Sequence, residues 1–263
     1  MDLGLRGKVA IVAGSSSGLG LACATELARE GASVVINGRR QSELSAAADA
    51  IRSATGATIH QVIGDVSKET DVRTLVESTL EKFGRLDIAV PNAGGPPVGY
   101  FDDFADSDYR RAIELNLIST VNLCRAAVPE MRKNRWGRIA AITSISAKQP
   151  VDNLILSNTS RAATVGFLRS LAQQVASEGI TVNVLCPGLH LTQRLRAIAA
   201  LEAKQRNVSV EEVYSRMAST IPMSRLGQPE EFAGLVAFLC SERASYITGT
   251  VTQIDGGLYK GLI

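Results

Sequence analysis

The sequence has little of what marks a membrane protein or a nucleic-acid-binding protein. None of its apolar runs approaches the ~18 residues that a membrane helix needs, and the opening MDLGLRGKVA lacks the basic and long apolar regions of a secretion signal. We therefore expect a cytoplasmic protein that does not bind membranes. With 28 basic and 26 acidic side chains, the net charge of +2 gives no field strong enough to predict nucleic-acid binding.

Cysteine is scarce as well. Cys23, Cys124, Cys186 and Cys240 lie far apart, with no C-x-x-C pair and no nearby pairing with histidine that would suggest a zinc site. We expect four buried, reduced thiols and no metal site. The sequence also has no internal repeat, low-complexity tract or linker, so residues 1–263 are predicted to form a single domain.

Short Val- and Ile-rich runs alternate with longer amphipathic segments along most of the chain. Leu44, Ala47, Ala48 and Ile51, for example, have the spacing of one buried helix face. The alternation predicts a mainly parallel sheet with helices on both faces. The expected strands are 8–14, 33–38, 58–63, 86–91, 137–143, 181–186 and 250–254.

The segment 187–228 interrupts this alternation. It carries two helix-like stretches, and the second follows a capping box formed by Ser209 and Glu212. A connection this long with its own helices is more often a lid or a binding element than a simple loop. We predict that it covers the substrate.

A glycine-rich turn, AGSSSGLG (13–20), joins the first predicted strand to a helix. Its spacing is G-x-x-x-G-x-G, with Gly14, Gly18 and Gly20. Such a turn lets the backbone approach a pyrophosphate, whose charge is held by the helix N-terminus. A tight structural turn alone would also explain these glycines, but the position at the first strand–helix junction favours a dinucleotide site.

The end of the second predicted strand favours NADP(H) over NAD(H). NAD sites place an acidic residue there, whereas NADP sites avoid that charge and offer arginine to the 2′-phosphate. This chain has Asn37, Gly38, Arg39 and Arg40, with no carboxylate. The alternative is that the two arginines simply begin a solvated helix.

Several motifs, in order along the chain, resemble those of the short-chain dehydrogenase/reductase family, and in particular 3-oxoacyl-acyl-carrier-protein reductases. The turn is similar to the family's T-G-x-x-x-G-x-G, with Ala13 replacing threonine. The other matching stretches are GDVS (64–67), PNAGG (91–95), LNL (115–117), ITSIS (142–146), CPGLHLT (186–192) and the tail 225–257. The resemblance covers the whole chain. It implies a single-domain Rossmann-type doubly wound sheet of about seven strands, nicotinamide-dependent hydride transfer, and commonly a homotetramer.

The resemblance also implies the site residues. Asp65 would meet adenine, Thr192 would contact nicotinamide, and the catalytic positions would be Asn116 and Ser144 together with those occupied by Ser157 and Arg161. The full cofactor set that it implies is Gly14, Ser16, Ser17, Gly18, Leu19, Gly20, Arg39, Arg40, Asp65, Val66, Asn92, Ala93, Gly94, Arg161, Pro187, Gly188 and Thr192.

One part of the family pattern is different. The family uses S-x12-Y-x3-K, in which lysine lowers the pKa of the tyrosine and holds the nicotinamide ribose. Counting from Ser144, this chain has Ser157 and Arg161 at those positions. A phenol has a pKa of ~10 and the pKa of an aliphatic alcohol is several units higher, near that of bulk water, so several kcal/mol of proton-donor advantage are absent. Arg161 keeps the charge but does not pass a proton on.

Four other sources of the proton are open. His190 titrates near neutrality, Lys148 lies in the loop after Ser144, and Tyr100 follows the PNAGG motif; the fourth is an ordered water. Each of the three side chains is otherwise explained as a surface or packing residue. His60 lies in the third predicted strand and is expected to be structural.

Two functions of different classes follow. The first is an NADP(H)-dependent oxidoreductase acting on a carbonyl or alcohol substrate, with a 3-oxoacyl thioester as one candidate. The second is a non-catalytic homologue that binds the nucleotide as a sensor or partner subunit. The segment 187–228 has apolar and basic side chains, which suit an acidic or acyl-carrier ligand but equally a partner subunit.

Overall fold

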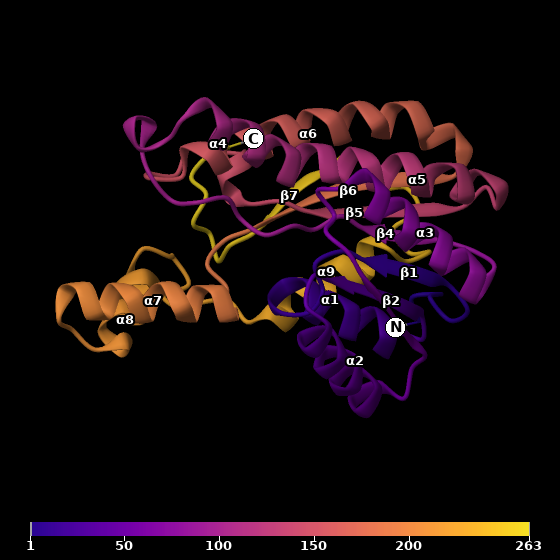
Figure 1. The fold of residues 1–263 in the computed structure, drawn as a ribbon, viewed down its shortest axis with the longest axis horizontal. Coiled ribbons are helices and arrows are strands. Elements are labelled where there is room, and N and C mark those ends of the chain that lie inside the picture. Colours follow the sequence, from indigo (N-terminus) through magenta and orange to yellow (C-terminus); the bar gives the residue numbers. More distant parts are fainter. Residues whose placement is uncertain (1, 263) are drawn as a thin grey trace.

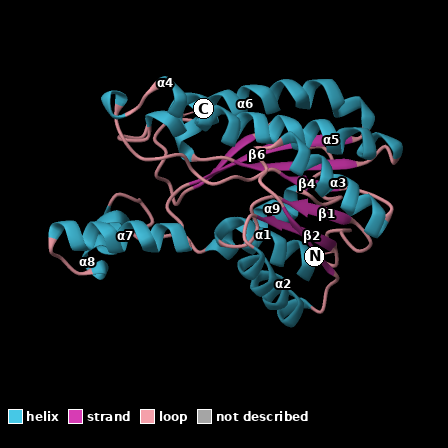
Figure 2. Ribbon diagram, viewed as in Figure 1, coloured by secondary structure: helices cyan, strands magenta, loops and turns pink. Residues whose placement is uncertain are grey.

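A single parallel sheet with helices on both faces dominates the structure, a computed structural model that describes residues 2–262 (Figures 1 and 2). The sheet order is β3-β2-β1-β4-β5-β6-β7. Every expected strand is present, with its ends within two residues of the prediction, and the expected Rossmann-type fold is confirmed. The strands are β1 (Val9–Val12), β2 (Ser33–Gly38), β3 (Ile59–Ile63), β4 (Ile88–Val90), β5 (Gly137–Ile142), β6 (Ile180–Pro187) and β7 (Val251–Ile254).

The helices form two layers (Figure 1). One face of the sheet carries α1, α2 and α9, and the other carries α3, α5 and α6. The helices are α1 (Gly18–Arg29), α2 (Gln41–Thr55), α3 (Glu69–Phe83), α4 (Asp106–Ile113), α5 (Ser119–Lys133), α6 (Ile155–Val175), α7 (Gln193–Arg206), α8 (Val210–Ser219) and α9 (Pro229–Leu239). Within residues 2–262, none of them combines the length and the apolarity that a bilayer crossing needs.

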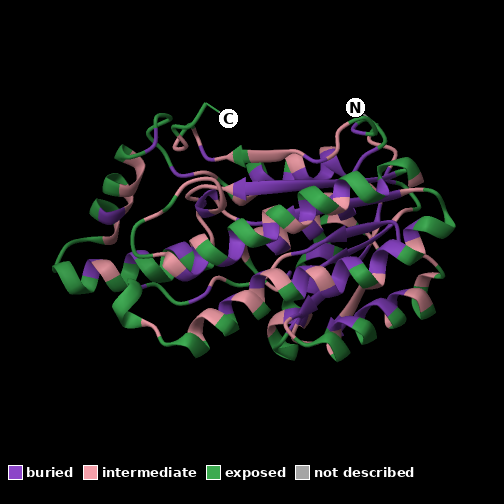
Figure 3. Cartoon of the chain, turned by 90° about the horizontal axis from the view of Figure 1, so that it is seen from above, coloured by how far each residue is buried: buried purple, intermediate pink, exposed green. Residues whose placement is uncertain are grey.

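The strands are buried on both sides, which explains their continuous apolar runs. In β1, Ala10 and Val12 face one apolar core, while Ile11, on the opposite side of the strand, belongs to the other. Figure 3 shows this burial concentrated in the sheet and on the inward sides of the helices. All four cysteines are buried and free, as expected.

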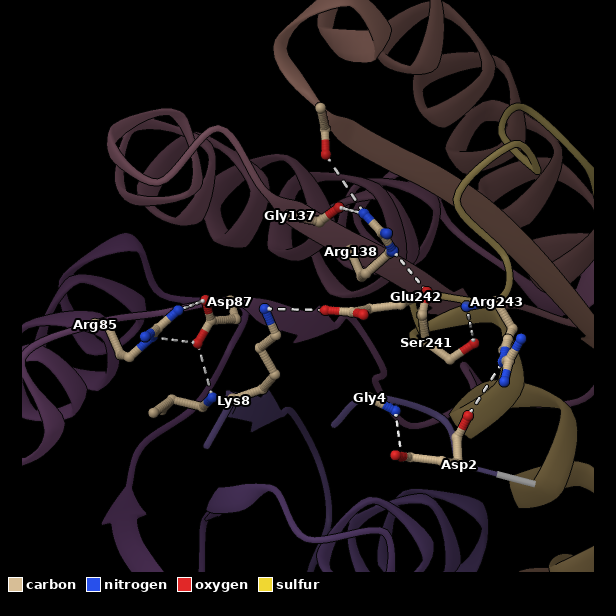
Figure 4. Close-up of polar contacts among 12 residues, drawn as sticks. Asp2, Gly4, Lys8, Arg85, Asp87, Gly137, Arg138, Ser241, Glu242 and Arg243 are labelled. Atoms are coloured by element: carbon tan, nitrogen blue, oxygen red, sulfur yellow. Dashed lines mark hydrogen bonds and ion pairs between the residues drawn. The ribbon is translucent and has the colours of Figure 1, made fainter. Parts of the chain in front are cut away.

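The amino ends of the strands are closed by a polar network (Figure 4). The fully buried carboxylate of Asp87 accepts hydrogen bonds from the Val9 amide at 2.9 Å and from two guanidinium nitrogens of Arg85 at 2.7 Å each. Nearby, Arg138 Nε donates to the Ser241 carbonyl at 3.1 Å. These bonds tie the residue before β4 to β1, and β5 to the segment that follows α9.

Helices α7 and α8 project from the body of the molecule as an arm, which we define as residues 193–219 (Figure 1). The two helices pack on each other through a small core of Ala199, Ala203 and Val213. The predicted capping box is present: Ser209 Oγ accepts from the Glu212 amide at 3.1 Å, and the Glu212 carboxylate accepts from the Ser209 amide at 2.9 Å.

Candidate active site

The glycine-rich turn lies where the strand order reverses, between β1 and β4, which is where open α/β sheets bind ligands. Gly14 and Gly18 have positive φ angles of 54° and 60°. A Cβ on Gly20 would lie 2.4 Å from the Gly14 carbonyl oxygen, so only glycine fits there. Asn92 Nδ2 donates to the carbonyls of Ala13 and Gly14, both at 3.1 Å, and clamps the turn.

The helix that follows presents a free N-terminus. Helix α1 begins at Gly18 with no acidic side chain in its first turn, and Ser17 at its cap makes no side-chain hydrogen bond to the helix. The first main-chain amides and the helix dipole therefore favour an anion at this point. This local geometry fits the pyrophosphate of a dinucleotide.

One side of the turn opens into a cavity of about 310 Å³, lined by Arg39, Arg40 and Asp65 among others. The Arg40 guanidinium is exposed and paired with Glu43 in the next turn. Burial alone would raise the pKa of the Asp65 carboxyl, but hydrogen bonds from the Ser67 amide and hydroxyl, together with the charge of Arg39, lower it overall. Asp65 is therefore an anion at neutral pH.

The side-chain amide of Asn37, the next-to-last residue of β2, has a structural role. Its buried Nδ2 donates to the carbonyls of Val62 and Gly64 at 3.1 and 3.2 Å. An aspartate here would place acceptor oxygens against two other acceptors. The Asn37 side chain thus holds β2 against the end of β3.

The other side of the turn opens into a cavity of about 360 Å³ at the carboxyl ends of the central strands. Both cavities are lined by Gly14, Ser17, Ala93, Gly94 and Gly95, so they form one elongated cleft. A cleft of this shape, with anion-binding amides at its middle, fits an extended dinucleotide. The polar residues that line its larger end are Thr143, Ser144, Ser157, Arg161, His190, Thr192 and Arg194, with Ser17 and Asn92 beside the turn.

Ser144 and Ser157 are linked through Ser146. Ser144 Oγ accepts a hydrogen bond from the Ser146 amide at 3.1 Å, and the hydroxyls of Ser146 and Ser157 lie 3.0 Å apart. Ser144 follows β5, whereas Ser157 lies in the first turn of α6. Residues thirteen apart in sequence therefore share one wall of the cavity, as expected, and Ser146 is a contact that the sequence did not single out.

Arg161 lies one helical turn after Ser157 and is only 8% exposed. Its Nη1 donates to the Thr143 carbonyl at 2.7 Å, whereas its buried Nε has no hydrogen-bond partner among the described residues. Burial, and secondarily the charge of Arg194, lowers the pKa of the Arg161 guanidinium to about 10. It remains a cation at neutral pH.

Asn116 is not on the cavity wall. It lies in a π-helical turn, Glu114–Ile118, where it is buried and its Nδ2 donates to Ser160 Oγ at 3.1 Å and to the Ala112 carbonyl at 3.3 Å. Ser160 directly precedes Arg161 on α6. Asn116 therefore lies behind this helix and contacts it from the side away from the cleft.

Two of the four proton sources are not brought to the cavity. Lys148 turns toward β7, where its Nζ donates to Gln253 Oε1 at 2.9 Å and to the Val251 carbonyl at 3.3 Å. Tyr100 is 63% exposed and does not line the cleft. His60 bonds Ser78 Oγ at 2.8 Å on α3, which agrees with a structural role.

His190 does line the cavity, and it also borders a smaller one of about 130 Å³. The ring is buried, stands edge-on to Phe232 and has Nδ1 3.4 Å from the Gly188 carbonyl. Burial lowers the pKa of His190, an effect that the Gly188 carbonyl and the acids Glu231 and Asp255 only partly oppose. Its imidazole is therefore mainly neutral at pH 7.

Sequence reasoning placed Arg194 only among the basic residues of segment 187–228, not in the site. The side chain crosses the cleft from the start of α7, and its Nη2 donates to the Pro96 carbonyl at 3.3 Å. Gly95 makes room for it, because a Cβ there would lie 2.0 Å from Arg194 Nη1. The sequence held no signal for this contact, because the two residues lie on separate segments, 99 positions apart.

The fold and the cleft define a dinucleotide-binding α/β protein with a polar reaction chamber beside the nucleotide turn. Residues 13–259 match the family model described as enoyl-(acyl carrier protein) reductase. The chain belongs to the short-chain dehydrogenase/reductase family and is an oxidoreductase of the kind that uses a nicotinamide cofactor.

Relatives with similar sequences and structures span nearly the whole chain. Dehydrogenase/reductase SDR family member 4 from Oryctolagus cuniculus is 37% identical over 96% of this chain and 94% of its own. A 3-oxoacyl-[acyl-carrier-protein] reductase from Aquifex aeolicus is 33% identical over 98% of this chain and all of its own. Among solved structures, L-sorbose reductase from Gluconobacter frateurii, complexed with NADPH and L-sorbose, has a TM-score of 0.97 and 37% identity over all of both chains.

Proposed function

We propose that this chain is an NADP(H)-dependent reductase that transfers hydride to the carbonyl carbon of a small substrate. The observation that carries the proposal is the convergence of Ser144, Ser157 and Arg161 at one end of a cleft whose other end has the geometry of a dinucleotide site. In this proposal Ser157 and Arg161 replace the Tyr and Lys of the family pattern. A 3-oxoacyl thioester is one substrate that the resemblance suggests.

The cofactor is held by the glycine turn and by the residues that the resemblance assigns. The N-terminus of α1 would hold its pyrophosphate, Asp65 and Val66 would contact adenine, and Thr192 would contact nicotinamide. Arg39 is the better candidate for the 2′-phosphate, since Arg40 is already paired with Glu43. The absence of an acidic side chain from residues 37–40 supports the preference for NADP(H) over NAD(H).

The catalytic end divides the work among three side chains. When bound, the nicotinamide supplies the hydride. Ser144 Oγ donates a hydrogen bond to the substrate carbonyl oxygen, and the buried charge of Arg161 stabilises the negative charge that develops there. Ser157, held by Ser146 at 3.0 Å, positions a water beside that oxygen. Asn116 is a positioning residue that acts on α6 through Ser160.

His190 is the proton donor in this proposal. Of the described residues, it is the one histidine that lines the cavity, and it also borders a second cavity, from which solvent would return the proton that the imidazole gives up. The alternative is the water held by Ser157. Lys148 and Tyr100 are set aside, because neither lines the cleft.

The remaining expectations are proposals of the same kind. Residues 1–263 form one functional unit, the segment 187–228 closes over the substrate as a lid, and the enzyme works as a cytoplasmic homotetramer. Oxidation of NADPH, followed by absorbance with a panel of ketones and 3-oxoacyl thioesters, tests the activity. We expect the kcat of Ser144→Ala to be roughly a hundredfold below that of the wild-type protein, because the variant loses one hydrogen-bond donor to the oxyanion.

A second candidate is a non-catalytic nucleotide-binding homologue. It is favoured by one observation: no tyrosine is among the residues that line the cleft, so no phenol replaces the absent acid. This candidate predicts tight NADPH binding without turnover, and turnover gained in the double variant Ser157→Tyr/Arg161→Lys. Wild-type reduction of any carbonyl compound excludes it.

A further inference from the structure

The larger cavity has an unbalanced charge. Its titratable lining side chains are Arg161, His190 and Arg194, and no aspartate or glutamate lines it. His190 is mainly neutral, so the wall carries two positive charges and no negative one. An electropositive chamber of this kind is complementary to an anion.

Arg161 carries the buried part of this charge. Its Nη1 donates to the main-chain carbonyl of Thr143, whereas its buried Nε has no hydrogen-bond partner among the described residues. In the family pattern the corresponding lysine acts on a tyrosine, but here the neighbour is a serine that stays neutral. A buried guanidinium without a counter-charge is costly unless a ligand supplies one.

Arg194 carries the accessible part. It is exposed at the cleft mouth, where its Nη2 donates to the Pro96 carbonyl at 3.3 Å. Other arginines of the same arm are paired, since Arg206 and Arg216 both contact the Glu202 carboxylate. No carboxylate of residues 2–262 pairs with Arg194, which leaves most of its planar donor group for a ligand.

The cofactor does not account for both guanidiniums. Its pyrophosphate fits the N-terminus of α1, and its 2′-phosphate fits the Arg39 end of the cleft, whereas Arg161 contacts Thr143 beside Ser144 at the opposite end. The rest of that end is largely apolar. Its aliphatic lining residues are Val98, Ile142, Leu154, Leu189, Leu195 and Ile198.

We propose that the substrate is an oxo acid: a ketone with a neighbouring carboxylate and an apolar tail. Arg194 binds the carboxylate as it closes the mouth of the cleft, Ser144 and Arg161 hold the ketone oxygen, and the tail packs on the aliphatic wall. This inference deepens the proposed function and rests on it, because it takes the ketone to be the group that is reduced.

Isothermal titration calorimetry on the wild-type protein saturated with NADP⁺ tests the inference without turnover. The probes are 2-oxo acids with aliphatic tails of increasing length, each paired with its neutral primary amide. At least one acid binds roughly tenfold more tightly than its amide, as a charge-assisted hydrogen bond requires. Arg194→Gln removes this preference, and Arg196→Gln, on the same helix but outside the cavity, retains it.

Three results overturn the inference: every acid binds no better than its amide, Arg194→Gln retains the preference, or Arg194→Gln weakens NADPH binding as much as acid binding. The last would assign Arg194 to the cofactor. Product analysis with NADPH separates this failure from failure of the proposed function. If neutral ketones are reduced as fast as oxo acids, the inference fails and the proposed function stands. If an acid binds through Arg194 and is never reduced, the proposed function fails, the acid is not a substrate, and only the carboxylate-binding site remains.

Discussion

The two halves of the cleft are built from different parts of the chain. The nucleotide half consists of main-chain amides and glycines, whose places are fixed by positive φ angles and by contacts such as that of Gly20 with the Gly14 carbonyl. The catalytic half consists of side chains, Ser144, Ser157 and Arg161, on a rigid strand end and helix. Side chains can be substituted without moving the backbone that carries them. The glycines of the turn cannot be substituted in this way, because their backbone conformation and close contacts require glycine. This difference explains how the chain keeps its fold and nucleotide cleft with an unusual catalytic pair.

Removing the buried cation is expected to have the largest effect on the reaction. Arg161→Met leaves a neutral side chain where charge develops, so kcat falls on the order of a hundredfold or more, as for loss of an oxyanion donor. NADPH affinity, measured by fluorescence titration, changes much less. Arg161→Lys keeps the charge and serves as the matched control. Equal kcat values for Met and Arg at this position would contradict the assignment.

A side chain added in the glycine turn is expected to weaken NADPH binding more than it slows the chemical step. A Cβ at Gly20 meets the Gly14 carbonyl at 2.4 Å, and overpacking of this kind costs ~1–3 kcal/mol, so the Kd for NADPH rises roughly tenfold to a hundredfold in Gly20→Ala. Gly234→Ala in α9 is the control, since a Cβ there meets nothing within 4 Å. Wild-type affinity in Gly20→Ala would show that the turn does not hold the cofactor.

A smaller effect is expected at the 2′-phosphate. Arg39→Gln raises the Kd for NADPH roughly tenfold, as loss of a hydrogen bond to a charged group does, and leaves the Kd for NADH unchanged. Arg40→Gln has a weaker effect because that guanidinium is shared with Glu43. If both cofactors are weakened equally, or neither is, the preference for NADP(H) is wrong.

The smallest change concerns pH. Burial lowers the pKa of His190 below its ordinary 6.5, so the imidazolium that can donate a proton is lost as pH rises through that lowered value, and the rate of carbonyl reduction falls. His190→Gln flattens the profile between about pH 5 and 8. Unfolding measured at each pH is the control, because a histidine buried in its neutral form also costs stability as pH falls below about 6.5. An unchanged profile would assign the proton to water.

The sequence predicted the fold closely, because the strands are apolar on both sides and the helices carry clear stripes, as in Leu44 and Ile51. It also placed Ser144, Ser157 and Arg161 on one wall, since their separations follow from a strand end and a helical turn. The sequence could not show that Lys148 turns toward β7, because its hydrogen-bond partner Gln253 lies 105 residues away along the chain.

Contacts that depend on side-chain direction were likewise invisible in the sequence. Asn116 turns toward Ser160 because a π-helical turn interrupts the helix there. Arg194 reaches into the cleft because Gly95, on a distant loop, leaves space for it. In both cases the partner was set by packing between elements far apart in sequence.

The central claim is that Ser157 and Arg161 support hydride transfer rather than mark its loss. The most direct test is incubation of the wild-type protein with NADPH deuterated at the transferable position of the nicotinamide and a panel of oxo acids and ketones, followed by mass spectrometry of the products. We predict an alcohol that carries one deuterium at the former carbonyl carbon, formed by the wild-type protein and nearly absent with Ser144→Ala. Tight NADPH binding with no deuterated alcohol from any substrate would contradict the account and leave a nucleotide-binding protein without the reaction.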